Sequence, residues 1–234
     1  MIALTRTGPV AVLTFQRPDQ RNALTPEMLG QFCTLAEAIP PDARVLVVAG
    51  DGPTFCAGFD LTRCRDNPES TVLDDLLVEL HRAIQRLRVL PIPVVGAVQG
   101  AAIAGGCALL GGMDLIVSHP HAKLGYPVTP LGISPAVSAP TLIGAIGPGP
   151  ARELLLKPTL LSGHAAALVG LVHELVETPE AVLPRAMELA ADLAAKPPGG
   201  VSATRGWLGE FLNGVGAPVD SATRALMASR SLVG

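Results

Sequence analysis

The sequence predicts an α/β fold that ends in a helical region. Short apolar runs of strand type alternate with amphipathic helical segments along the first part of the chain, which is the pattern of an α/β core. From residue 135 onward the segments are mostly helical. With 234 residues, of which 49% are hydrophobic and only 16% charged, the chain suits one compact domain with a large buried core.

Turn and cap residues predict the N-terminal elements. Two apolar runs, at 2–5 and 10–15, surround a Thr-Gly turn and predict a β-hairpin. Thr25 as N-cap, with Pro26 behind it, predicts a helix that ends near residue 38. The next predicted elements are a buried strand over 44–49 and an amphipathic helix over 71–90.

The stretch from residue 91 to 118 is predicted to be the buried centre of the fold. The chain carries no formal charge between Arg88 and Asp114. It is predicted to form a buried strand, a glycine turn, a buried helix and a second buried strand, over 94–98, 99–100, 101–110 and 114–117. The helix contains Gly105 and Gly106, and open N–H groups at such a helix start can hold an oxyanion. Two alternatives are that the glycines only allow close packing, or that the stretch spans a membrane, which its prolines and glycines disfavour.

The C-terminal part is predicted to be helical around one strand over 171–176. A Pro-Pro-Gly-Gly sequence at 197–200 separates two of its helices. We therefore predict a core over residues 1–200 and a C-terminal helical region over residues 201–234. The predicted helices cover 138–146, 150–156, 163–169, 181–195, 201–212 and 221–230.

Composition and cysteine spacing argue against several classes of protein. The net charge of −3 comes without a basic run or an aromatic stripe, so we expect no nucleic-acid partner. The four cysteines form no CxxC pair and have no metal-ligand spacing, so we expect no metal site. Reduced, mostly buried thiols and the lack of a secretory signal fit a cytoplasmic protein without a membrane anchor. These cysteines are Cys33, Cys56, Cys64 and Cys107.

Seven segments, in their order and spacing, resemble the crotonase family, the enoyl-CoA hydratase/isomerase superfamily. The resemblance implies a crotonase-like spiral of ββα units with a helical C-terminal region, and a homotrimer or hexamer. It also implies that a coenzyme A thioester is the substrate or ligand and that no cofactor is bound permanently. The segments are RPDQRNAL at 17–24, TFCAGFDL at 54–61, PVVGAVQGAAIAGGCAL at 93–109, MDLIVSHPHAKLGYP at 113–127, PLGISPAVSAPTLIGAIG at 130–147, ARELLL at 151–156 and GLVHELV at 170–176.

The same resemblance implies an oxyanion hole, in which two backbone N–H groups hold the thioester oxygen as it becomes an enolate. One donor matches Phe59 in the Ala-Gly-Phe-Asp loop, and the other matches Gly105 at the start of the central helix. A solvated turn is the alternative for Arg17, Arg21 and Asn22. The residues that match the family's coenzyme A contacts are Arg21, Ala23, Ala57, Gly58, Asp60 and Leu61.

The sequence departs from the family at both catalytic glutamates of its hydratases. The positions that match them hold Ala108 and Val128, so the known proton-transfer groups are missing while the oxyanion-hole positions remain. Tyr126 and Ser134 are the first candidates for a replacement acid or base. Other candidates, each with a structural alternative, are Ser138 as a helix cap, Cys107 as a core residue, and His119 and His121 in a surface turn.

Two functions of different class are consistent with these features. The first is an acyl-CoA-processing enzyme that stabilises a thioester enolate, by hydration, isomerisation, decarboxylation or thioester hydrolysis. The second is a non-catalytic homologue that binds acyl-CoA or acyl-pantetheine, or an oligomer partner of an active paralogue.

The chain also stops short of the family's usual helical C-terminus. We therefore expect weaker nucleotide binding, or a site that a neighbouring subunit completes.

Overall fold

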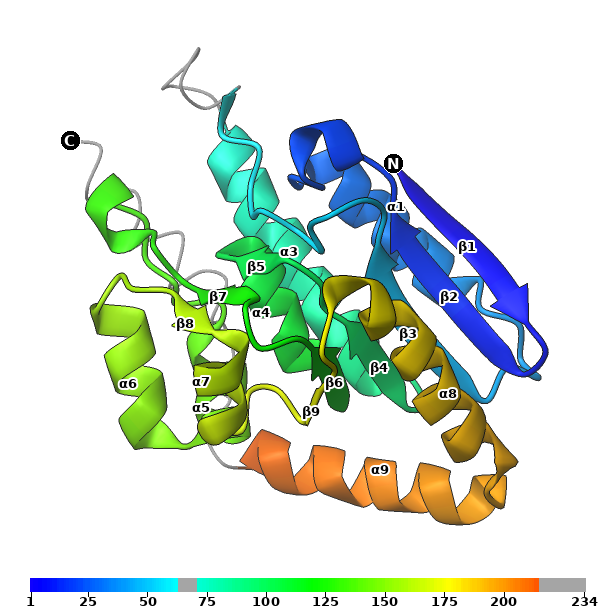
Figure 1. The fold of residues 1–234 in the computed structure, drawn as a ribbon. Helices are drawn as coiled ribbons and strands as arrows, with labels where there is room; N and C mark the ends of the chain where they lie inside the picture. Colours follow the sequence, from blue (N-terminus) through cyan, green and yellow to red (C-terminus); the bar gives the residue numbers. More distant parts are fainter. Residues whose placement is uncertain (63–70, 215–234) are drawn as a thin grey trace.

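The computed structural model describes residues 1–62 and 71–214 and has an α/β architecture, as predicted (Figure 1). A larger sheet has the strand order β1-β2-β3-β4-β6-β9, and a smaller sheet has the order β5-β7-β8. The strands are β1 Ile2–Thr7, β2 Val10–Phe15, β3 Val45–Gly50, β4 Val94–Ala97, β5 Ala101–Ile103, β6 Leu115–Ser118, β7 Lys123–Gly125, β8 Leu161–Ser162 and β9 Glu174–Leu175. The α-helices are α1 Pro26–Glu37, α3 Val72–Val89, α4 Gly105–Leu109, α5 Ala139–Ile146, α6 Pro148–Leu156, α7 Gly163–Leu168, α8 Val182–Ala195 and α9 Pro198–Gly214. Short 3-10 turns are η1 Pro18–Gln20, η2 Leu110–Gly112, η3 Thr129–Leu131 and η4 Pro179–Ala181.

The larger sheet is parallel except at its N-terminal hairpin. β1 and β2 pair antiparallel around Gly8, whose φ of 57° is a left-handed conformation that glycine adopts without strain. β2, β3, β4, β6 and β9 then pair in parallel. In β3 every residue from Val45 to Ala49 is buried. Both faces of this strand are therefore covered, which explains its uninterrupted apolar sequence.

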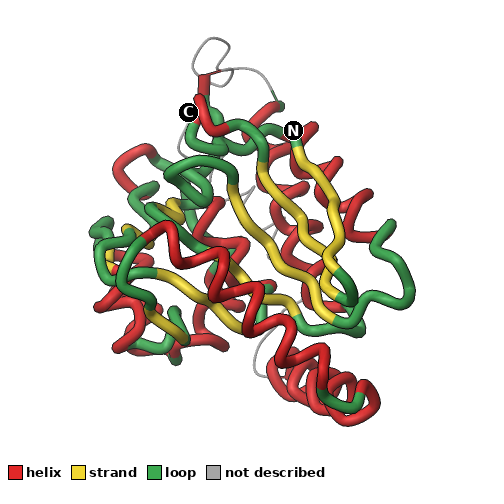
Figure 2. The backbone as a smooth tube through the Cα atoms, turned by 45° about the vertical axis from the view of Figure 1, so that its right-hand side comes forward, coloured by secondary structure: helices red, strands yellow, loops and turns green. Residues whose placement is uncertain are grey.

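Alternate residues of the parallel strands face two separate apolar layers. Val47 packs into the layer that α8 covers, whereas its neighbours Leu46 and Val48 belong to the main core with residues of α1, α3 and α4. Figure 2 shows one helix crossing in front of the strands and others behind them. The stripe that α8 presents to the sheet consists of small residues at helical spacing, which lets the helix lie close to the strands. These residues are Val182, Ala186, Ala190 and Ala194.

The central stretch differs from its prediction in one respect. Residues 101–103 form strand β5, so helix α4 begins only at Gly105. β5 pairs in parallel with β7, and Ala102 forms a further bridge with Cys56. Partners that are distant in sequence therefore hold this short segment extended. Gly105 lies where a strand turns almost directly into a helix.

Further predictions are corrected in the C-terminal part. The strand predicted over 171–176 is reduced to Glu174–Leu175, where β9 pairs with β6. The proline-glycine sequence opens helix α9 at Pro198, which agrees with the preference of proline for the start of a helix. Ser138 precedes α5 without capping it through its side chain. The helix predicted over 221–230 lies outside the described residues, as does Cys64.

Helix α9 is fixed to the core through Arg205. Its guanidinium donates hydrogen bonds to the carbonyl oxygens of Leu87, Arg88 and Leu90 at the end of α3. The same group donates to Asp114 Oδ2 at 2.8 Å, and that carboxylate also accepts from Val94 N–H at 2.7 Å. Arg205 thus supplies extra donors at the C-terminal end of α3, where backbone carbonyl groups run short of helical partners.

The described residues contain no candidate for a membrane-spanning helix or for a metal site. No helix among them combines the length and hydropathy that a membrane crossing requires. In the same part of the chain, no three His, Cys, Asp or Glu side chains are grouped so that they could hold a metal ion. The thiols of Cys33, Cys56 and Cys107 are free and buried, as predicted.

Replacing Ala190 by Leu should lower the free energy of unfolding by about 1–3 kcal/mol, because a larger side chain must push α8 away from the sheet. Urea unfolding followed by circular dichroism measures the loss. Ala191→Leu is the matched control, since Ala191 is exposed on the same helix and should change stability by less than about 0.5 kcal/mol. Equal losses in the two variants would contradict the close packing of α8.

Candidate active site

Two loops that are far apart in sequence pair with each other beside the central helix. Leu24 forms an isolated parallel bridge with Phe59. In this bridge Leu24 N–H donates to Gly58 O at 2.7 Å, and Asp60 N–H donates to Leu24 O at 2.8 Å. One residue of a parallel bridge bonds to both neighbours of its partner, so the partner's own N–H points to the opposite side. Phe59 therefore directs its N–H away from Leu24.

Gly105 lies against the Phe59 side chain. A Cβ on Gly105 would be 2.8 Å from Phe59 Cε1 and 3.3 Å from Leu24 Cδ1, so only glycine leaves room for the ring. Ala104 before it has a φ of 49°, an uncommon conformation for a residue with a side chain. Its N–H donates to Gly125 O at 2.8 Å, which fixes the turn between β5 and α4.

Neither Phe59 N–H nor Gly105 N–H donates a hydrogen bond to any of the residues that the structure describes. Gly105 is buried and Phe59 is half-buried. Leaving a buried backbone donor unpaired costs about 1–3 kcal/mol, so such donors are rare in proteins. The buried N–H of Gly105 and the half-buried N–H of Phe59 together form a candidate binding site for one oxygen atom.

A cleft of about 710 Å³ has Phe59 in its wall. This volume is within the usual range for ligand sites. The cleft brings together most of the predicted coenzyme A contacts, namely Arg21, Ala23, Asp60 and Leu61, together with Phe59. Ala57 and Gly58 do not line it. Instead, Ala57 N–H donates to Arg21 O at 2.9 Å and Gly58 O accepts from Leu24 N–H, so these two residues support the wall of the cleft.

A smaller cavity of about 30 Å³ adjoins the cleft and shares Phe59 and Ile133 with it. It has room for roughly two water molecules or a group of similar size. The structure brings several predicted site residues together in the lining of this cavity. Ala108 is not among them, because it is buried within α4. The predicted residues that do line the cavity are Phe59, Gly105, Tyr126, Val128, Ser134 and Ser138.

Tyr126 is buried between the cavity and α4. Burial raises the pKa of its hydroxyl well above the ordinary value, the neighbouring Cys107 raises it further, and the Ser138 hydroxyl lowers it. Tyr126 is therefore protonated near neutral pH and can donate a proton but cannot act as a base. Burial also raises the pKa of Cys107 to about 12, so this thiol is a neutral core group.

The two histidines lie outside the cleft and the cavity. The prediction of a surface turn is wrong for His119, which is only 5% exposed, whereas His121 is exposed. His119 Nε2 accepts a hydrogen bond from Gly100 N–H at 3.1 Å, and burial lowers the pKa of the imidazole. The neutral ring thus holds the turn that leads into β5.

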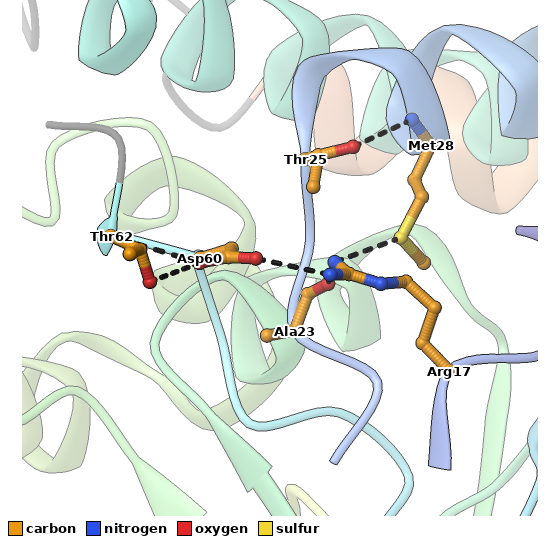
Figure 3. Close-up of polar contacts among 6 residues, drawn as sticks. All are labelled: Arg17, Ala23, Thr25, Met28, Asp60 and Thr62. Atoms are coloured by element: carbon orange, nitrogen blue, oxygen red, sulfur yellow. Dashed lines mark hydrogen bonds and ion pairs between the residues drawn. The ribbon is translucent and has the colours of Figure 1, made fainter. Parts of the chain in front are cut away.

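An ion pair that no sequence pattern predicted ties the first loop to the second (Figure 3). Arg17 Nη2 lies 3.1 Å from Asp60 Oδ2, and Arg17 Nη1 donates to Ala23 O at 2.8 Å. Asp60 Oδ1 accepts from the Thr62 hydroxyl at 2.8 Å. Hydrogen bonds from Thr62 and the Arg17 guanidinium lower the pKa of the Asp60 carboxyl, although its partial burial opposes them. The sequence shows only that the two segments carry opposite charges. It does not show which charged residues pair.

Asn22 is a second anchor that its sequence context did not predict. Its side chain is fully buried, so the solvated-turn alternative is wrong for this residue. Its Nδ2 donates to Asp51 O at 2.9 Å and to Thr54 O at 2.8 Å, and its Oδ1 accepts from Arg17 N–H at 2.8 Å. Arg21, by contrast, is exposed and lines the cleft. The amide therefore attaches the loop to the chain that precedes Phe59.

Comparison with known proteins identifies the family. A family model described as enoyl-CoA hydratase/isomerase matches residues 5–208. The chain belongs to the enoyl-CoA hydratase/isomerase family. A relative from Thermus thermophilus, assigned to the enoyl-CoA hydratases, is 32% identical over 202 residues, which are 85% of this chain and 79% of the relative. The 2,3-dehydroadipyl-CoA hydratase of Escherichia coli is 30% identical over 200 residues, 84% of this chain and 77% of that protein.

Solved structures of the enoyl-CoA hydratase/isomerase family share the fold. The crystal structure of an enoyl-CoA hydratase/isomerase from Mycobacterium paratuberculosis matches with a TM-score of 0.88 at 25% identity, over 100% of this chain and 94% of that one. The predicted crotonase fold is confirmed. A shared fold does not by itself assign roles to Phe59, Gly105 and the cleft residues.

Replacing Arg17 by Met should lower the free energy of unfolding by about 1–2 kcal/mol, because it leaves Asp60 and Ala23 O without their half-buried partner. The penalty should shrink as the pH falls below about 3.9. The lowered pKa of Asp60 means that its contribution is present above the ordinary pKa and lost as the carboxylate is protonated. Chemical unfolding between pH 3 and pH 7 measures both effects.

A double-mutant cycle with Asp60→Asn tests the pairing itself. The double variant should lose less than the sum of the single losses, since both changes remove one interaction. Arg6→Met is the matched control, because the Arg6–Asp42 pair has side chains 38% and 68% exposed and should change stability little. Additive losses for the two single variants would contradict a direct interaction between Arg17 and Asp60.

Proposed function

We propose that the protein binds an acyl-CoA thioester with the thioester oxygen between Phe59 N–H and Gly105 N–H. The pantetheine arm would lie along the cleft at Arg21, Ala23 and Asp60, and the acyl group would enter the small cavity. The observation that carries this proposal is the junction of cleft and cavity at Phe59, beside two donors without partners among the described residues. Membership of a family whose relatives are named as enoyl-CoA hydratases supports the choice of thioester.

Two hydrogen bonds to the thioester oxygen would stabilise the enolate that forms when an electron pair develops on the α-carbon. One such donor is worth roughly 10²–10³-fold in rate. The donors are held by backbone pairing on one side and by the strained Ala104 turn on the other, so they need little rearrangement to act. No permanently bound cofactor is needed for this step, since the protein's contribution is electrostatic.

We propose further that the reaction is not an ordinary hydration. In this chain the two positions that match the catalytic glutamates carry the methyl groups of Ala108 and Val128. A hydratase has to activate water at one carbon and deliver a proton to the next. Val128 presents an apolar surface to the cavity, and Ala108 is buried outside its lining. Hydration therefore lacks the acid–base pair on which it depends.

A non-catalytic acyl-thioester binder, or an oligomer partner of an active paralogue, is the second candidate, because the same missing carboxylates favour it. Its carrier could be acyl-pantetheine on a carrier protein. One observation favours that carrier. Within the described part of the cleft Arg21 is the only cation, beside the carboxylates of Asp19 and Asp60, and a nucleotide diphosphate end would need more positive charge.

The proposal includes an oligomeric assembly and a cytoplasmic location. We expect a homotrimer or hexamer, in keeping with the family resemblance. Leu156 and Leu168 are 72% and 77% exposed, and a neighbouring subunit would cover apolar side chains of this kind. A cytoplasmic location fits the three buried free thiols.

Acetyl-CoA should bind with a Kd below about 1 mM in calorimetry. The carbonyl band of bound [1-13C]acetyl-CoA should move to lower frequency in infrared spectra, because two N–H groups polarise it. A Kd for acetyl-pantetheine within about threefold of that for acetyl-CoA would indicate a pantetheine carrier. Absence of heat with every thioester would sink the proposal.

Gly105→Ala tests where the oxygen lies. The added methyl group would force the Phe59 ring to move, so affinity should fall at least tenfold and the infrared shift should disappear. The matched control is Gly149→Ala, since a Cβ on Gly149 has open space around it. A full infrared shift in the Gly105 variant would show that the oxygen binds elsewhere.

Crotonyl-CoA hydration should be slow, below about 0.1 s⁻¹, because each missing acid or base usually contributes about 10²–10⁴-fold. The loss of crotonyl-CoA absorbance measures it. Ala108→Glu alone should not restore the reaction, whereas Ala108→Glu with Val128→Glu should restore part of it if the pocket accepts two carboxylates. A wild-type turnover of about 1–10³ s⁻¹ would show that another residue replaces the glutamates.

A further inference from the structure

Three hydroxyl groups supply the polar side chains of the small cavity. Among the described residues, Tyr126, Ser134 and Ser138 are its only polar lining side chains, and the others are apolar or glycine. Tyr126 and Ser138 are both almost fully buried, and their hydroxyls interact with each other. This set matters only if an acyl group enters the cavity, so a role for it in chemistry rests on the proposed function.

A cavity with only hydroxyl groups supports reactions that need no base. Hydration, isomerisation and thioester hydrolysis all require a group that removes a proton from water or carbon. Serine and tyrosine hydroxyls, with the pKa of Tyr126 raised by burial, cannot do this near neutral pH. Decarboxylation requires no base, because its electron pair comes from the bond to the departing carboxylate. It requires an electron sink and a proton donor.

We propose that the cavity decarboxylates a short acyl thioester that carries a carboxylate on its α-carbon, with Tyr126 as the proton donor. The bond between the α-carbon and the carboxylate carbon breaks, and CO₂ leaves. The electron pair forms an enolate whose oxygen is held by Phe59 N–H and Gly105 N–H. Tyr126 O–H then gives its proton to the α-carbon. Water resupplies that proton through Ser138 when the product leaves, so one proton is consumed for each CO₂ released.

The lining of the cavity favours the loss of CO₂. Leu77, Leu80 and Val137 surround the space with apolar surface, and no cation lines it among the described residues. A carboxylate in such surroundings is poorly solvated, and it escapes this penalty by leaving as neutral CO₂. The volume of about 30 Å³ fits a carboxylate group and excludes a long acyl chain.

Malonyl-CoA is the probe, and the product is followed by NMR in D₂O. The wild-type protein should release CO₂ and form acetyl-CoA with one deuterium in its methyl group. Succinyl-CoA is the matched ligand, because it has the same charge but its carboxylate cannot leave an enolate behind, so it should stay intact. The rate should be flat between pH 6 and pH 9, since a donor with a raised pKa remains protonated over that range.

Tyr126→Phe keeps the ring and removes the proton donor. It should lower the turnover of malonyl-CoA by about 10²–10⁴-fold while changing the Kd of acetyl-CoA by less than about threefold. A melting temperature close to the wild-type value shows that the variant is folded. If it does not fold, the pH profile of the wild-type protein decides, since a fall in rate with a midpoint near pH 7 would overturn the role of Tyr126.

Failure of this inference is distinct from failure of the proposed function. If acetyl-CoA binds with a shifted carbonyl band but malonyl-CoA stays intact, decarboxylation is overturned and thioester binding stands. If malonyl-CoA is decarboxylated at the same rate by the Tyr126 variant, the proton donor is another group. If no thioester binds, the proposed function fails first.

Discussion

The candidate site depends on the pairing of two loops, at 21–24 and 57–60. The bridge between Leu24 and Phe59 uses the hydrogen-bonding groups of one side of the second loop and leaves Phe59 N–H on the other side. Arg17 strengthens this pairing, because it bonds to Ala23 O in the first loop and to Asp60 in the second. The buried amide of Asn22 fixes the first loop to the chain before the second, at Asp51 O and Thr54 O. These contacts join segments that are distant along the chain, with a sequence separation of 43 for the Arg17–Asp60 bond. Without them the donor at Phe59 would have no fixed direction.

The two glycines of the central helix have different roles. A Cβ on Gly106 would lie 2.5 Å from Cys56 O, so this glycine allows the helix to pack against the loop below it. Gly105 borders the cavity and makes room for the Phe59 ring. Close packing and an open N–H group were alternatives for the Gly-Gly pair as a whole. The structure assigns packing to one glycine and leaves the N–H of the other without a partner among the described residues.

Ala108 and Val128, the positions that the family resemblance matches to catalytic glutamates, carry apolar side chains in a conserved type of fold. Val128 contributes apolar surface to the cavity, and Ala108 lies within the core beside Cys107, whose pKa burial raises. In such surroundings a charged substrate group is destabilised and neutral hydroxyl groups are retained. Family membership therefore describes the scaffold, whereas the proposed thioester site and its proton transfers depend on the side chains of this chain. The reaction has to be argued from the groups that remain.

Local chemistry in the sequence determined most elements of this protein. Thr25 and Pro26 begin α1, where Thr25 Oγ1 accepts from Met28 N–H at 3.2 Å, and the apolar runs of β2 and β3 form buried strands. The sequence also determined that positions 108 and 128 carry alanine and valine, which have no acid or base group. Only the tertiary structure decided that 101–103 is a strand, that His119 is buried, and that Arg17 pairs with Asp60. The physical reason is the same in each case: these states are set by partners that are distant along the chain, which a local pattern of residues does not contain.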